Sequence, residues 1–193
     1  MEGGRMSTTE SDEVLYGRFL EGDKAALDQL LERHGNSLTL FLRGYVDSME
    51  DAEDLMMDSF VAIAMKKSWA AKGSTFKTWL FAIGRNLALM HMRRRKRTVC
   101  QDWTMEASMQ DTGEHPEMKI LQDESRRTLF QALDHLKEEY REVLYLMYFD
   151  EMTVEEICQV MNRSKTQVYH LTTRGREALR RELERMGFDD RVY

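Results

Sequence analysis

The chain of 193 residues has one proline, two cysteines and no long apolar run. Proline makes up about 5% of an ordinary protein and breaks helix interiors, so its scarcity favours an almost entirely helical fold. The longest stretch without Asp, Glu, Lys or Arg is nine residues, His34–Leu42, whereas a membrane-spanning helix needs about 20 apolar residues. Cys100 and Cys158 stand in unrelated surroundings and suggest no disulfide framework. We therefore expect an all-α protein of the reducing cytoplasm, without membrane insertion.

The motifs that bind cofactors or carry out catalysis are also missing. The eleven glycines form neither G-x-G-x-x-G nor a G-K-[ST] phosphate loop. The five histidines and two cysteines lack the spacing of metal ligands or of a catalytic triad, and no H-E-x-x-H occurs. The sequence therefore predicts no cofactor, no metal site and no enzymatic activity.

Charge is segregated along the chain, although the net charge is only −6. Residues 47–58 hold six acidic residues and no base, and residues 85–97 hold six bases and no acid. Residues 163–181 are basic again, whereas residues 99–122 carry five acids, one lysine and the only proline. The acidic stretch lacks an apolar stripe and is predicted to be a flexible linker between two small helical domains. The predicted boundaries are a flexible N-terminus at 1–11, a domain at 12–98, the linker at 99–122, a second domain at 123–186 and a tail at 187–193.

The first domain is predicted to contain a helix or helix pair over 12–34, and helices over 38–46, from about 48 to 67, and 76–97. The last of these has an apolar stripe and an opposite face that mixes bases with an aromatic residue. The stripe comprises Phe76, Trp79, Leu80, Ile83, Leu87 and Met90, and the opposite face comprises Lys77, Phe81, Arg85, Met92 and Lys96. Such a face suits nucleic acid, because rings stack on bases and cations meet phosphates. The alternative is a second core contact beside a solvated basic face, and the pattern alone leaves both open.

The second domain shows the pattern of a helix-turn-helix. Helices are predicted over 124–136 and 138–149, followed by capping boxes at Thr153-x-x-Glu156 and Ser164-x-x-Gln167. Asn162 stands between the last two helices, where a left-handed residue is needed. Two short helices joined by about three residues, the second one basic, are typical of major-groove readers. An ordinary helical hairpin with a charged outer face is the alternative.

Three motifs together make the chain resemble a sigma-70 family RNA polymerase sigma factor of the extracytoplasmic-function (ECF) type. Residues 51–55 (DAEDL) resemble the helix of that family that binds the core polymerase. Residues 76–86 (FKTWLFAIGRN), leading into 93–97 (RRRKR), resemble its −10-element helix. The segments of 136–176 that include LKEEYREV and TVEEI resemble its −35-binding domain.

The resemblance implies a role for each set of residues. The residues expected to bind core polymerase are Asp51, Glu53, Asp54, Leu55, Met56, Asp58 and Ser59. Those expected to bind the −10 element are Lys72, Ser74, Phe76, Lys77, Trp79, Phe81, Arg85, Asn86, Arg93, Arg94, Arg95, Lys96 and Arg97. Those expected to bind the −35 element are Arg163, Ser164, Lys165, Thr166, Gln167, Tyr169, His170, Thr173, Arg174 and Arg176. Gly175 departs from the family pattern and is expected to weaken the recognition helix.

The expected function is therefore an alternative sigma factor whose partners are core RNA polymerase and promoter DNA. An anti-sigma factor is a further hypothesis, because many relatives are held inactive by one. Flipping a base costs a few kcal/mol and stacking returns about 1–3, so the free protein is expected to bind promoters weakly. A classical helix-turn-helix regulator acting as a dimer is the main alternative, but it leaves residues 47–58 and 76–97 without a role. A purely structural helical adaptor is a further alternative.

Overall fold

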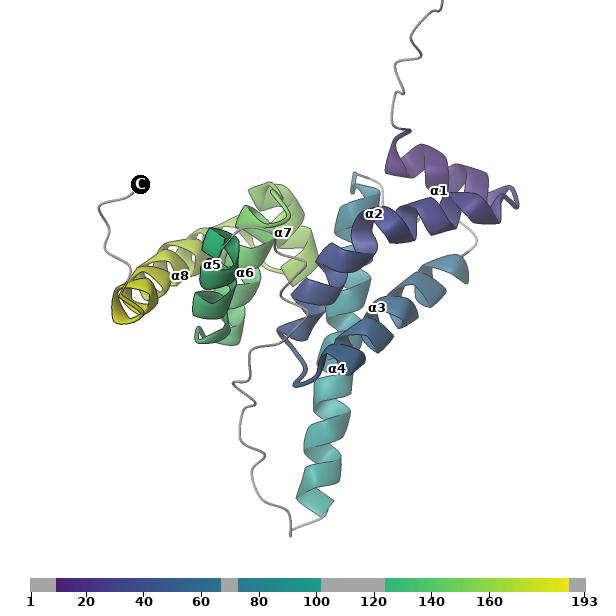
Figure 1. The fold of residues 1–193 in the computed structure, drawn as a ribbon. Helices are drawn as coiled ribbons and strands as arrows, with labels where there is room; N and C mark the ends of the chain where they lie inside the picture. Colours follow the sequence, from purple (N-terminus) through teal and green to yellow (C-terminus); the bar gives the residue numbers. More distant parts are fainter. Residues whose placement is uncertain (1–9, 67–72, 102–123, 188–193) are drawn as a thin grey trace, which may run out of the picture.

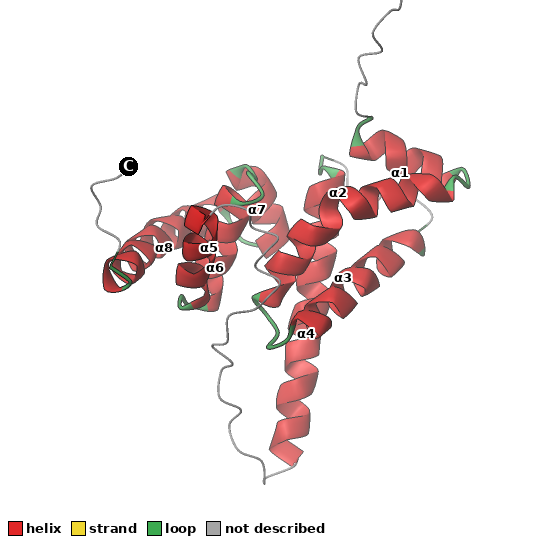
Figure 2. Cartoon of the chain, viewed as in Figure 1, coloured by secondary structure: helices red, strands yellow, loops and turns green. Residues whose placement is uncertain are grey.

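The computed structural model describes residues 10–66, 73–101 and 124–187, and this part of the chain forms eight helices and no strand (Figures 1 and 2). None of these described helices is long and apolar enough to cross a membrane. The helices are α1 (Asp12–Leu20), α2 (Lys24–Arg43), α3 (Met49–Ala64), α4 (Phe76–Gln101), α5 (Glu124–Asp134), α6 (Glu138–Tyr148), α7 (Val154–Met161) and α8 (Lys165–Arg185). The expected all-α class is confirmed.

Helices α1 to α4 form the first group, in which α1, α2 and α3 all pack against α4. Tyr16 of α1 is buried, and its ring lies 5.6 Å from the ring of Phe76 and 5.5 Å from that of Trp79. Phe81, on another side of α4, lies 5.3 Å from Phe41 of α2. Because aromatic rings bury large apolar areas, these contacts fix α4 as the central helix of this group.

Helices α5 to α8 form a second group, in which α6 and α7 pack against α8. Both predicted capping boxes are present: Thr153 with Glu156 begins α7, and Ser164 with Gln167 begins α8. Asn162 ends α7 in the left-handed conformation, with φ 51°. The helix-turn-helix therefore forms where the local signals place it.

The two groups of helices lie in contact along one side (Figure 1). Helix α7 packs against α4, and α6 packs against the C-terminal part of α2. The rings of Phe41 and Tyr145 lie 5.7 Å apart across this boundary. The Tyr145 hydroxyl donates to the carbonyl of Ser37 at 2.9 Å. The boundary is therefore a packed interface between α2 and α4 on one side and α6 and α7 on the other.

Two predicted helix boundaries are wrong. Helix α2 runs without a break from Lys24 to Arg43, through the expected gap between His34 and Leu38. Its Gly35 is buried where α2 approaches Met56 of α3, so packing between the two helices supports the continuous helix. Helix α4 continues to Gln101 and thus includes the first three residues of the predicted linker. The remaining linker residues, 102–122, and most of both predicted tails lie outside the described residues.

Candidate polymerase and nucleic-acid interfaces

Helix α3 has one buried face and one exposed face of unusual composition. Ser48 caps its first turn by accepting a hydrogen bond from the amide of Asp51 at 3.0 Å. The exposed face carries three apolar side chains, Met57, Val61 and Met65, which are 47%, 52% and 79% exposed. The acidic residues around them are Glu53, Asp54 and Asp58, all exposed. This face combines an apolar stripe with an acidic border, which is the composition of a protein-docking surface.

The seven residues expected to bind polymerase fall on both sides of α3. Glu53, Asp54 and Asp58 are exposed, whereas Leu55 and Ser59 are buried in the core of the N-terminal group. The Ser59 hydroxyl donates to the carbonyl of Leu55 and is unavailable to a partner. Asp51 and Met56 are half-buried. Sequence reasoning missed Met57, Val61 and Met65, although their spacing of four residues places them on one helix face.

Helix α4 begins with two capping contacts. The Thr75 hydroxyl accepts from the amide of Thr78 at 3.2 Å, and the Glu13 carboxylate of α1 accepts from the amide of Phe76 at 3.2 Å. Together they satisfy two of the amides that a helix start leaves unpaired. The start of α4 is therefore held by a local cap and by a cap from another helix.

The three aromatic residues expected to contact −10 DNA lie in the core. Phe76 and Phe81 are fully buried, and Trp79 is 8% exposed. The helical wheel placed Phe81 opposite the apolar stripe, where it could either face nucleic acid or form a second core contact. In the structure Phe81 forms a second core contact. None of the three rings is accessible for stacking on a base in this arrangement, so their effect on the surface is to position α4. Met90, expected in the apolar stripe, is 47% exposed, whereas its neighbours Leu89 and Met92 are packed against the core.

Two bases of α4 are paired with carboxylates of the C-terminal helices. Lys77 Nζ lies 2.9 Å from Asp150 Oδ1, and the Arg85 guanidinium forms an ion pair with Glu142. Asp150 and Glu142 are almost completely buried. Burial raises the pKa of both carboxyls, and the ion pairs with Lys77 and Arg85 offset only part of that rise. The predicted basic face is therefore not solvated at these positions.

The remaining −10 residues are distributed along the rest of α4. Asn86, Arg93, Arg94 and Arg95 are exposed, and Ser74 is half-buried. Arg95 forms an ion pair with Asp47. Lys72 lies outside the described residues, as do the side chains of Lys96 and Arg97. The exposed part of α4 thus presents a short run of guanidinium groups, which suits phosphate binding.

All ten residues expected to bind the −35 element are exposed on α8 or directly before it. Ser164 and Gln167 form the capping box, so their side chains also hold the start of the helix. Tyr169 is 59% exposed, and the Arg176 guanidinium lies 5.7 Å from the ring of Tyr148. The start of the helix presents short polar groups beside Lys165, and Arg174 and Arg176 follow farther along, an arrangement that suits a recognition helix.

Gly175 has a packing role that the sequence alone did not reveal. It is buried, and a Cβ at this position would lie 3.3 Å from Leu144 Cδ1 and 3.5 Å from Tyr140 Cβ. The glycine thus allows close approach of α8 to α6. Gly175 was expected to weaken the recognition helix, and the structure shows that it also lets α8 pack closely against α6.

Comparisons with known proteins agree with this geometry. Residues 30–98 match "Sigma-70 region 2" and residues 126–179 match "Sigma-70, region 4". The chain is 30% identical to the RNA polymerase sigma-H factor of Pseudomonas aeruginosa, over 93% of this chain and 97% of that protein. It belongs to the sigma-70 family, as an ECF-type sigma factor. It is also 26% identical to the ECF sigma factor SigW of Bacillus subtilis, over 84% of this chain and 91% of that protein.

A solved structure resembles the fold of this sigma factor. It is the sigma factor RpoE of Bartonella quintana in complex with the anti-sigma factor NepR, with a TM-score of 0.64 and 23% identity. The match covers 81% of this chain and 96% of that one. Sigma factors are initiation subunits rather than enzymes, and this one directs promoter-specific transcription with core RNA polymerase. A classical helix-turn-helix regulator would account for the match to region 4 at residues 126–179 but not for the match to region 2 at residues 30–98.

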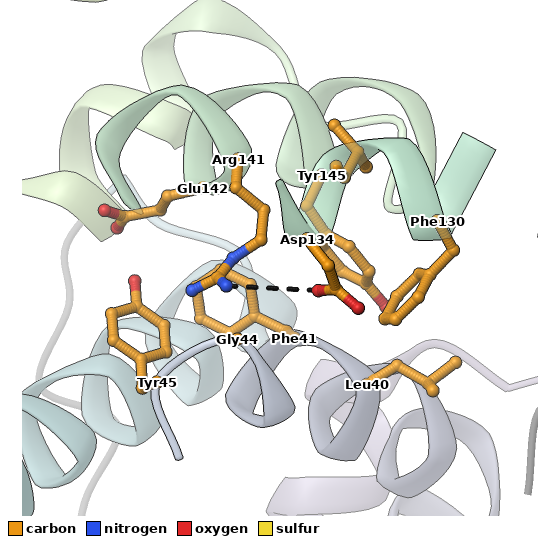
Figure 3. A pocket seen from close by; sticks show the side chains of 10 residues that line it. Leu40, Phe41, Gly44, Tyr45, Phe130, Asp134, Arg141, Glu142 and Tyr145 are labelled. Atoms are coloured by element: carbon orange, nitrogen blue, oxygen red, sulfur yellow. Dashed lines mark ion pairs between the residues drawn. The ribbon is translucent and has the colours of Figure 1, made fainter. Parts of the chain in front are cut away.

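The interface between the two helix groups of the sigma factor contains a narrow crevice at the end of α2 (Figure 3). Arg141 of α6 points into it, 4.0 Å from Asp134 and with its guanidinium 6.0 Å from the centre of the Tyr45 ring. Burial lowers the pKa of Arg141. A Cβ on Gly44 would lie 2.6 Å from Arg141 Cζ, so this contact depends on a glycine.

Proposed function

We propose that this sigma factor docks on core RNA polymerase through the exposed face of α3, and reads promoter DNA with α4 and α8. In this proposal the exposed residues Met57, Val61 and Met65 supply the apolar contact. The acidic side chains around them select a basic partner surface. The proposed division is a polymerase- and −10-binding domain over 12–98 and a −35-binding domain over 123–186.

The observation that carries the proposal is the uncovered apolar stripe of α3. Large apolar side chains on a surface helix cost hydration free energy unless a partner covers them. The stripe lies between exposed carboxylates, and its most exposed member, Met65, is 79% exposed. A flexible, apolar Met-rich face bordered by charge suits a helical partner surface.

The DNA-reading part of the proposal is supported by the exposure of α8 and by the length of the connecting chain. The ten predicted −35 residues are all exposed, on α8 or directly before it. Residues 102–123, between α4 and α5, can reach at most about 75 Å if fully extended. Two major-groove contacts two helical turns apart are about 70 Å apart, within this reach. The two basic helices can therefore bind separate promoter elements of one DNA molecule.

The proposal also includes a partner and a compartment. The related Bartonella sigma factor is bound to an anti-sigma factor, and we propose a protein of that kind as a regulator here. Because the function requires polymerase and chromosomal DNA, we place the chain in the cytoplasm. No residue is assigned a catalytic role.

A single substitution on α3 tests the docking face. Val61→Asp places a charge in the apolar stripe, and burying a valine contributes about 1.5–3 kcal/mol, so binding to purified core polymerase should weaken roughly 10- to 100-fold. Val14→Asp is the matched control, because Val14 of α1 is exposed to a similar extent, 50% against 52%. Equal binding by both variants in a titration with labelled protein would contradict the proposed face.

Transcription in vitro tests the whole function. Purified core polymerase with the wild-type chain should produce transcripts from start sites that core alone does not use. The Val61→Asp variant should lose them in proportion to its loss of binding. A classical regulator would instead change the yield at existing start sites.

A further inference from the structure

The methionines of helix α3 divide between its core side and its exposed side. Met56 packs against the core, and its Sδ lies 3.8 Å from the position that a Cβ on Gly35 of α2 would take. Met57 and Met65 are 47% and 79% exposed. They are two helical turns apart on one face, with Val61 between them. Two of the three apolar side chains of the proposed docking face are therefore solvent-accessible thioethers.

Exposed methionines are rare in the rest of the described chain. Met152 and Met161 are buried, at 5% and 2% exposed, and Met147 is partly buried and packed against the core. Among the described residues outside α3, one methionine is exposed, Met90 of α4 at 47%. A methionine sulfur reacts with a dissolved oxidant where solvent reaches it. The docking face thus holds two of the three described methionines that are open to such a reaction.

The charges around the face favour one kind of oxidant. Glu53, Asp54 and Asp58 are exposed carboxylates of α3. They repel anions that approach the face, whereas they do not oppose the approach of a neutral molecule. Hydrogen peroxide is small and uncharged, so it reaches the sulfurs without electrostatic cost. The face therefore suits a neutral peroxide better than an anionic oxidant.

We propose that Met57 and Met65 form a reversible oxidation site, at which hydrogen peroxide turns the docking face polar and weakens its binding to core polymerase. The proposal rests on the proposed function of α3. In each reaction the thioether sulfur attacks one peroxide oxygen, the O–O bond breaks and an S=O bond forms. The sulfur gives up two electrons. The second peroxide oxygen leaves as hydroxide and takes the proton of the transferred oxygen, so that water is released.

A sulfoxide changes the complex more than it changes the free chain. Its oxygen accepts hydrogen bonds from water, and a partner surface that covers the face displaces this water. An acceptor buried without a hydrogen-bond donor is unfavourable, whereas the same oxygen on the free chain stays hydrated. Met57 and Met65 are exposed, so their oxidation leaves the core of the N-terminal group intact. Methionine sulfoxide reductases reduce both sulfoxide epimers, which makes the change reversible.

Peroxide treatment of the purified full-length chain tests the site. Catalase removes the peroxide before core polymerase is added, so that the polymerase is not oxidised. Peptide mapping by mass spectrometry should find sulfoxide at Met57 and Met65 well before Met152 and Met161. The Kd for core polymerase should rise about tenfold for each sulfoxide that the partner covers. Treatment with the reductases for both epimers should restore the original Kd.

Leucine variants separate this face from the other sulfurs. Met57→Leu/Met65→Leu removes both thioethers and keeps the face apolar, and Met90→Leu is the matched control, because Met90 is as exposed as Met57. The readout is the ratio of the Kd after peroxide to the Kd before it, within each variant. This ratio should stay near 1 for the double variant and should match the wild type for Met90→Leu. Dithiothreitol in the binding buffer reverses sulfenic acid and disulfide formation at Cys158.

Two results would overturn the oxidation site: an equal loss of binding in the double variant and the wild type, or sulfoxide at both positions of the wild type with an unchanged Kd. If circular dichroism shows that the double variant is unfolded, the wild type still decides, because its binding must recover with the reductases. Val61→Asp tests the docking face without changing a sulfur. If Val61→Asp binds core polymerase as tightly as the wild type, the proposed face fails. If Val61→Asp weakens binding and peroxide does not, the face stands and the oxidation site alone fails.

Discussion

The two basic helices of this sigma factor carry similar charges but present them differently. On α8, Lys165 is 60% exposed and pairs with the equally exposed Glu155. On α4, Lys77 and Arg85 have side-chain exposures of 28% and 12%, and they pair with carboxylates that are 2% exposed. Two helices of similar composition therefore differ in how much of their positive charge is accessible to solvent.

The difference arises from the number of faces that each helix buries. Helix α8 buries Val168, Thr172, Gly175 and Leu179 against α5, α6 and α7, and the bases expected to bind the −35 element stay exposed. Helix α4 is in contact with α1, α2 and α3 and also with α7. A helix covered on several sides has its bases held in place by neighbours, and those neighbours supply the counter-charges.

The largest expected effect concerns the packing of α8 against α6. Gly175→Leu would push side-chain atoms into Leu144, whose Cδ1 already lies 3.3 Å from a Cβ at position 175. Overpacking of this kind costs about 1–3 kcal/mol. Chemical denaturation should show this loss, and transcription from promoters that need the −35 element should fall with it. Gly17→Leu in α1 is the control, because a Cβ there meets nothing within 4 Å. If Gly175→Leu is as stable as Gly17→Leu, the close approach of α6 and α8 is not essential.

The helix starts provide the second test. Ser164→Ala removes the side chain that accepts from the amide of Gln167 in the capping box of α8, and loss of such a cap costs about 1 kcal/mol. Thr75→Ala should cost less, because Glu13 still accepts from the amide of Phe76 at the start of α4. Urea titrations of both variants measure the difference. An equal loss in both would contradict the view that α1 helps to cap α4.

DNA binding provides the third test. Arg174→Ala removes a cation from the exposed face of α8, and one phosphate contact corresponds to a change of about 0.9 in the slope of log K against log salt, or roughly fivefold weaker duplex binding at 0.15 M salt. This loss should appear both in the free chain and in the complex with polymerase. Arg85→Ala should weaken only the complex, since Arg85 is paired with Glu142 in the free chain. Salt titrations by fluorescence anisotropy distinguish the two patterns. If Arg85→Ala weakens DNA binding by the free chain to the same extent, the ion pair with Glu142 does not keep Arg85 from DNA.

The contrast between α4 and α8 also marks how far sequence reasoning reaches. The start of α8 was predicted because its signals are local: a serine, a glutamine three residues later and Asn162 in the preceding turn. The helical state of α4 was equally readable from its cap and its apolar period. Short-range hydrogen bonds and helix period require no knowledge of distant residues.

The residues that surround α4 could not be predicted from the sequence, because they lie far from α4 along the chain. Arg85 and Glu142 are 57 positions apart, and Lys77 and Asp150 are 73 apart. A helical wheel shows that Phe81 and Arg85 share a face but does not show that another helix group covers that face. Leu55 and Ser59 of α3, which the resemblance assigned to polymerase binding, lie in the core. The four-residue spacing of Met57, Val61 and Met65, off the buried stripe, was a usable signal for the exposed face.

The smallest expected effect is on stability in acid. It concerns the contacts that hold α1 against α2, and α1 also supplies Glu13, which caps α4. Asp12 of α1 lies 2.7 Å from His34 Nε2 and also pairs with Arg33, both of α2. Burial raises the pKa of Asp12, but its hydrogen bonds and charge interactions with His34 and Arg33 outweigh burial and leave the pKa below its ordinary value of 3.8. A lowered carboxyl pKa stabilises the folded state above about pH 4, and this contribution is lost as the pH falls through the folded-state pKa.

Asp12→Asn should therefore lower the free energy of unfolding by about 0.5 kcal/mol near neutral pH, as for a partly exposed ion pair. The difference from wild type should disappear as the pH falls below about 3, where the wild-type carboxyl is itself protonated. Thermal melts at stepped pH measure this, with Asp28→Asn as a control on the exposed side of α2. A difference that persists undiminished at the lowest pH would show that the amide disturbs packing rather than charge. In that case the packing of Asp12, rather than its charge, anchors α1 to α2.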